Sequence, residues 1–162
     1  MISFVFSTNP KNILSRIIRR FTKSKCSHVA LLTDEFLGIQ CVMEATLVGV
    51  ALTPLQTFLA RGNVIVDVVE PEVDLREGLR ATAQLLAAAY DFSGLLGMLF
   101  VYLGRALHKR WRNPWRTSTS MFCSELVTRA MQAASYPGAD QLDPHSTSPE
   151  DLLEWLKRVR PQ

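Results

Sequence analysis

The sequence predicts a single α+β domain in which β-strands come first and helices follow. Short strand-like runs bounded by Pro, Gly and Asn lie within residues 2–70, whereas residues 74–158 hold apolar side chains at helical spacing. The chain has 162 residues, of which 48% are hydrophobic and 20% charged, so one domain over residues 1–162 can bury its own core. The three cysteines are an odd number, which argues against a secreted disulfide scaffold.

The first half of the chain holds the predicted strands and two helices. A helix is predicted over residues 11–22, because its apolar residues share one face and its basic residues the other. A hairpin turn is predicted at 34–40, which contains Gly38. A short helix over 53–60 is expected to have Thr53 as its N-cap and Pro54 as its first residue. The predicted strands are residues 2–7, 27–33, 41–47 and 63–70.

The second half of the chain is predicted to be helical. One helix follows the capping-box spacing of Asp74 and Glu77 and extends to Tyr90. A second is expected from about residue 93 to 110 and a third over 121–134. The last helix is expected to start with an N-cap, a first-position proline and two early acids, which are Ser148, Pro149, Glu150 and Asp151.

No segment of the sequence has the pattern of a secretory signal or a membrane span. The start of the chain lacks a basic residue before its short apolar stretch, which ends at Asn9-Pro10. The longest apolar run, residues 95–103, is much shorter than the roughly 20 residues that a bilayer requires. We therefore expect a cytoplasmic protein.

His28 and Glu44 are predicted to face each other across a β-hairpin. If residues 27–33 and 41–47 pair as antiparallel strands around a turn centred on Phe36, His28 lies opposite Glu44. That register also sets Ala30, Leu32, Val42 and Thr46 on the same face. A carboxylate that accepts a hydrogen bond from one imidazole nitrogen fixes the tautomer and raises the basicity of the other nitrogen.

Cys123 is predicted to lie in the first turn of a helix. With Ser120 as the N-cap, Cys123 falls near the third helical position. The partial positive charge and free N–H groups of a helix N-terminus favour thiolate over thiol and can hold a developing oxyanion. A thiolate, a histidine on a facing strand and a group that orients the histidine are the parts of a thiol acyl-transfer site.

These residues stand in three short motifs. The motifs are Ser27-His28-Val29-Ala30-Leu31-Leu32, Met43-Glu44-Ala45 with Gly49-Val50, and Phe122-Cys123-Ser124-Glu125-Leu126-Val127. Together they resemble the circularly permuted papain-like branch of the NlpC superfamily, to which YiiX-like cysteine hydrolases belong and lecithin retinol acyltransferase is distantly related. In that branch the histidine precedes the cysteine along the chain. The resemblance covers most of residues 1–155.

The resemblance implies a permuted papain-like fold, in which a small antiparallel sheet packs with helices and the catalytic cysteine begins a helix. It also implies that Cys123 is the nucleophile, His28 the base and Glu44 the orienting group of an amidase- or peptidase-type hydrolase. The substrate would be a small molecule, peptide or lipid with an amide or ester bond. Two alternatives remain open: a lipid acyltransferase or deacylase at a membrane surface, and a catalytically silent binding module. The mechanism requires no metal or organic cofactor.

Two further patterns bear on ligands and partners. A zinc site formed by Cys26, His28 and Cys41 is disfavoured, because the paired spacing typical of zinc sites is missing. Residues 104–116 hold five basic and no acidic residues, with two tryptophans among them. We interpret this block as a binding surface for an anionic membrane more readily than for nucleic acid. The alternative is a basic face that is exposed to solvent and binds no partner. The proposed contacts are Arg105, Lys109, Arg110, Trp111, Arg112, Trp115 and Arg116.

Overall fold

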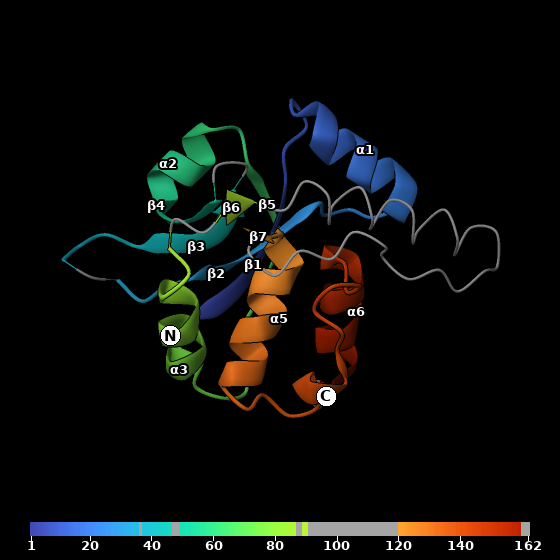
Figure 1. Cartoon of the computed structure of the whole chain (residues 1–162). Helices are drawn as coiled ribbons and strands as arrows, with labels where there is room; N and C mark the ends of the chain where they lie inside the picture. Colours follow the sequence, from blue (N-terminus) through green and yellow to red (C-terminus); the bar gives the residue numbers. More distant parts are fainter. Residues whose placement is uncertain (36, 47–48, 87–88, 91–119, 160–162) are drawn as a thin grey trace.

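The computed structural model describes residues 1–35, 37–46, 49–86, 89–90 and 120–159 (Figure 1). The described part of the chain is mixed α+β, as the sequence predicts. The helix predicted from about residue 93 to 110 and the basic block 104–116 lie outside the described residues. None of the helices in the described ranges has the length and apolar character needed to cross a bilayer.

A five-stranded sheet is the centre of the fold, and its neighbouring strands are all antiparallel. The strand order is β4-β3-β2-β1-β5. All four predicted strands form, and a fifth, β4, lies between the third predicted strand and the short helix. The strands are β1 (Ser3–Thr8), β2 (His28–Leu32), β3 (Cys41–Thr46), β4 (Gly49–Pro54) and β5 (Val64–Val69).

The helices agree with the sequence prediction at their cores and depart from it at several ends. The α-helices are α1 (Ile13–Thr22), α2 (Leu55–Ala60), α3 (Arg76–Ala83), α5 (Cys123–Ala133) and α6 (Pro149–Val159), and a 3₁₀ turn spans Ala139–Gln141. The N-cap predicted for α6 is confirmed, and Ser148 and Asp151 form a capping box. The Asp151 N–H donates to Ser148 Oγ at 3.0 Å, and Asp151 Oδ2 accepts from the Ser148 N–H at 3.1 Å.

Two helix predictions are wrong, one at the start of α2 and one at the end of α3. Thr53 is not the cap of α2, because residues 49–54 pair along the whole of β3 and Pro54 becomes the N-cap. The helix that begins near Asp74 does not reach Tyr90. It ends at Ala83, since Leu86 forms a bridge to Val50, and β6 (Ala89–Tyr90) then pairs in parallel with β7 (Ser120–Met121).

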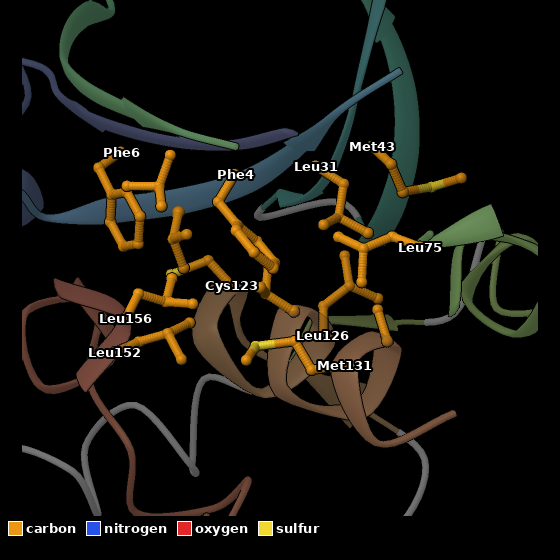
Figure 2. Close-up of a cluster of buried hydrophobic side chains, with 14 of the residues drawn as sticks. Phe4, Phe6, Leu31, Met43, Leu75, Cys123, Leu126, Met131, Leu152 and Leu156 are labelled. Atoms are coloured by element: carbon orange, nitrogen blue, oxygen red, sulfur yellow. The ribbon is translucent and has the colours of Figure 1, made fainter. Parts of the chain in front are cut away.

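The hydrophobic core lies between one face of the sheet and a layer formed by α3, α5 and α6 (Figure 1). Figure 2 shows sheet residues such as Phe4 and Leu31 facing Leu126 of α5 and Leu152 of α6. Helices α3 and α5 approach so closely at Gly78 that a Cβ there would overlap the Ala130 carbonyl oxygen. Helix α2 covers part of the opposite face, where Ala30, Val42 and Phe58 form a smaller cluster. The candidate site lies where β2 and α5 both begin.

Candidate active site

His28 and Glu44 are in direct contact, as predicted. His28 Nε2 lies 3.1 Å from Glu44 Oε2. The two side chains share the face of the sheet that carries the Ala30, Val42 and Phe58 cluster, and the His28 ring stacks on Phe58 with ring centroids 6.1 Å apart. The predicted shared face is thus confirmed.

The register behind this contact differs from the predicted one by two residues. Leu31 pairs with Met43 and Leu32 with Val42, so Glu44 is a diagonal neighbour of His28 and not its direct partner. A shift of two residues keeps every side chain on its predicted face, because side chains alternate with a period of two. The diagonal geometry is still within reach of long side chains. Phe36, the predicted centre of the turn, lies outside the described residues.

Glu44 is a buried carboxylate held by three partners. Thr53 donates its hydroxyl to Glu44 Oε1 at 2.8 Å, and Arg61 Nη1 lies 3.3 Å from the same oxygen. Burial alone raises the pKa of Glu44, but the His28 contact, the Thr53 hydroxyl and the Arg61 charge outweigh it and lower that pKa. Glu44 is therefore ionised at neutral pH and supplies a negative charge to His28.

Cys123 is the first residue of α5, and Phe122 occupies the N-cap position. The prediction that Ser120 caps this helix is wrong, because residues 120–121 form β7 and the helix starts only after them. In either case the thiol lies at the helix N-terminus, whose partial positive charge favours the thiolate. Cys123 is 8% exposed and lies at the border of the main core.

The Cys123 thiol and the His28 imidazole are hydrogen-bonded to each other. Because Nε2 of His28 faces Glu44, Nδ1 is the ring nitrogen left for the sulfur. Burial lowers the pKa of His28, but its hydrogen bonds to Cys123 and Glu44 dominate and raise that pKa to about 10. His28 keeps 22% of its side chain exposed, so the ring is in contact with solvent.

The Cys123 thiol has a pKa below its ordinary value. Burial acts in the opposite direction, yet the hydrogen bond and the charge of His28 overcome it. The backbone N–H groups of Val29 and Ser124 add two more donors to the sulfur. The raised pKa of His28 and the lowered pKa of Cys123 share one cause, which is the mutual stabilisation of a thiolate–imidazolium pair, and Glu44 adds to the rise at His28.

The start of α5 is held in place by polar contacts behind the cysteine. Ser124 Oγ donates to the Thr147 carbonyl oxygen at 2.7 Å. Glu125 is buried and accepts from Arg129 Nη2 at 2.9 Å, and His145 Nδ1 lies 3.3 Å from it. These contacts anchor the first turn of α5 to the loop that precedes α6, so the position of Cys123 does not rest on backbone bonds alone.

The other two cysteines have different surroundings. Cys26 is almost fully buried, its Sγ lies 3.4 Å from Glu150 Oε2, and burial above all raises the pKa of its thiol to about 12. Cys41 is half-buried at the start of β3. Cys26, His28 and Cys41 do not come together as a zinc site, and His, Cys, Asp and Glu form no metal-binding group of three within the described ranges.

Sequence reasoning missed Thr53 and Arg61 as members of the site. The sequence predicts Thr53 as a helix cap, whereas it lies on β4 opposite Val42 and on the same face as Glu44. If residues 49–54 had been predicted as a strand, Thr53 would have been placed beside Glu44. No local signal identifies Arg61, which follows α2 and reaches Glu44 only through the tertiary fold.

Comparison of the chain with protein-family models and with curated proteins finds no match. The chemistry of this site is therefore inferred from its geometry alone. A thiol at a helix start is hydrogen-bonded to an imidazole, and a buried carboxylate orients that imidazole.

Proposed function

We propose that this protein is a cysteine-dependent hydrolase that cleaves an amide or ester bond through a thiol acyl-enzyme. Cys123 is the nucleophile, His28 the acid and base, and Glu44 the group that orients His28. The observation that carries the proposal is the chain of contacts from Cys123 through His28 to Glu44. In this proposal the domain has the circularly permuted papain-like fold, with the histidine strand before the cysteine helix in the sequence.

In the first step, the Cys123 thiolate attacks the carbonyl carbon of the substrate and an S–C bond forms. The negative charge that develops on the carbonyl oxygen is held by the free N–H groups of the first turn of α5. The His28 imidazolium gives its proton to the leaving amine or alcohol as the C–N or C–O bond breaks. The product of this step is a thioester on Cys123 and a neutral His28.

In the second step, neutral His28 accepts a proton from water, and the resulting hydroxide attacks the thioester carbonyl. The C–S bond breaks and the carboxylic acid leaves, while His28 keeps the proton that it took from water, so the thiolate–imidazolium ion pair with Cys123 forms again. Glu44 remains ionised throughout and keeps the ring in the orientation that both steps use.

The proposal is tested with a small electrophilic thiol probe and mass spectrometry. We expect iodoacetamide to label Cys123 well before Cys26 or Cys41 at slightly acid pH, because the Cys123 pKa is lowered and the Cys26 pKa is raised to about 12. In the His28→Ala variant the labelling of Cys123 slows toward the rate of an ordinary thiol. Equal labelling of the three cysteines in the unmodified chain contradicts the proposal.

The nucleophile is then tested for turnover. A trapped acyl adduct of increased mass is expected on Cys123 after incubation with activated esters, and it is expected to decay in water. Cys123→Ala removes the adduct and Cys26→Ala retains it. An adduct that forms on Cys123 but never hydrolyses indicates a binding module or an acyltransferase and overturns the hydrolase assignment.

A further inference from the structure

The outer face of α1 combines exposed isoleucines with exposed arginines. Ile13 is 71% exposed and Ile17, one turn later, is 38% exposed. Arg16 and Arg20 are exposed as well. At 3.6 residues per turn, these four residues fall within an arc of roughly 100° on the helix. Single exposed apolar side chains are common on protein surfaces, but a pair on one face beside two arginines is a distinct pattern.

The segment of the chain that contains α1 carries charge of one sign. Residues 1–30 hold six basic and no acidic residues. Three lysines flank the helix and are exposed, namely Lys11, Lys23 and Lys25. Figure 1 shows α1 set apart from the layer of α3, α5 and α6. The outer face of α1 therefore presents positive charge and apolar surface together.

The inner side of α1 is tied to β1 and to the residue just before β2, the strand that carries His28. Ser15 Oγ lies 2.6 Å from Ser27 Oγ and 3.3 Å from Thr8 Oγ1. Arg19, which is only half-exposed, donates from Nη1 to Thr8 Oγ1 at 3.4 Å. Because Ser27 directly precedes His28, the outer face of α1 is held at a fixed position near the beginning of β2.

We propose that the outer face of α1 docks on an anionic lipid surface. Arg16 and Arg20 bind the phosphates of the headgroups, while Ile13 and Ile17 enter the boundary between headgroups and acyl chains. Nucleic acid fits this face less well, since its binding relies on aromatic side chains that stack on bases, and isoleucine offers no such platform. The lysines around the helix add to the attraction at low ionic strength.

The proposal is tested by co-sedimentation of the full chain with vesicles. We expect binding to phosphatidylcholine vesicles that contain phosphatidylglycerol, and little binding to phosphatidylcholine alone. Arg16→Gln with Arg20→Gln is expected to lower the partition coefficient by roughly 25-fold, since each basic residue near an anionic surface contributes about 1 kcal/mol, or about five-fold. Salt near 1 M is expected to have a similar effect, because it shortens the Debye length to about 3 Å.

Two sets of variants separate this surface from the rest of the chain. Ile13→Ser with Ile17→Ser is expected to weaken vesicle binding even at low salt, because the apolar contribution is lost. Arg76→Gln with Arg80→Gln is the matched control, since these exposed arginines of α3 have the same spacing and lie outside α1. This control is expected to change binding by less than about two-fold, as its charges do not face the vesicle.

Three outcomes overturn the proposal. The first is no binding of the unmodified chain to anionic vesicles. The second is binding that the α1 variants retain, which would assign it to another part of the chain. The third is loss of binding with the arginine variant but not with the isoleucine variant, together with equal affinity for single-stranded RNA, which would indicate a general polyanion site. Cys123→Ser is expected to bind vesicles normally, so the vesicle experiment tests the α1 surface independently of the proposed hydrolase activity.

Discussion

Replacement of Glu44 by glutamine tests whether its charge sets the protonation of His28. The substitution keeps the size of the side chain and an oxygen that can accept a hydrogen bond, and removes one negative charge 3.1 Å from His28 Nε2. At an effective dielectric constant of about 20, a charge pair at this distance interacts with about 5 kcal/mol.

Part of that interaction is offset in the native site. Arg61 lies 3.3 Å from the other oxygen of Glu44 and attenuates its negative field at His28. The amide oxygen of the variant can still accept a hydrogen bond from the imidazole, so this contribution is kept. We therefore expect Glu44→Gln to lower the pKa of His28 by roughly 1 to 3, equivalent to about 1.4 to 4 kcal/mol. The direction follows because the charge of Glu44 stabilises the imidazolium.

The assay is an NMR titration of the His28 ring in the unmodified chain and in the variant. In the unmodified chain, the His28 ring is expected to stay protonated until the pH approaches its pKa of about 10. In the variant, the ring is expected to lose its proton at a lower pH. The pKa of Cys123 is expected to rise at the same time, because its imidazolium partner is less stable, and the rate of alkylation near neutral pH is expected to fall.

Glu77→Gln is the control, since Glu77 is exposed and pairs with Arg80 on α3. An unchanged His28 midpoint in Glu44→Gln refutes the reasoning, as does a midpoint near the ordinary histidine value of 6.5 in the unmodified chain. Either result would mean that the contact between His28 and Glu44 is a neutral hydrogen bond without electrostatic consequence.

Two predictions concern the scaffold that holds the site. Gly78→Ala is expected to destabilise the protein by about 1 to 3 kcal/mol, because the new Cβ overlaps the Ala130 carbonyl oxygen and forces α3 away from α5. Urea denaturation measures this loss, and an unchanged midpoint would show that the two helices separate freely. Ser148→Ala removes one half of the capping box of α6 and is expected to cost about 0.5 to 2 kcal/mol. Thermal unfolding checks it, with Ser146→Ala as the control on the adjacent loop, and equal loss in both variants would contradict a specific role for the cap.

Several features of this protein follow from the sequence alone. Short strand-like runs bounded by turn residues predict β1, β2, β3 and β5, and the Ser-Pro-Glu-Asp start predicts α6 and its cap. His28 and Glu44 share a face as the sequence predicts, because the face depends only on the period of two along each strand. The sequence places Cys123 near a helix start, and it is the first residue of α5. Each of these features depends on residues that are close together in the sequence, so the sequence alone can predict it.

The tertiary structure decided the rest. Strand β4 and the bridge from Leu86 to Val50 depend on pairing that local patterns do not reveal, so those patterns assign some of their residues to helices. The two-residue shift of β2 against β3 leaves every side chain on its predicted face, so the alternation along each strand does not distinguish the two registers. Thr53 and Arg61 meet Glu44 only through that pairing. Only the packing of α5 on the sheet sets the Cys123 thiol beside His28, and a thiol pKa depends on such neighbours in space.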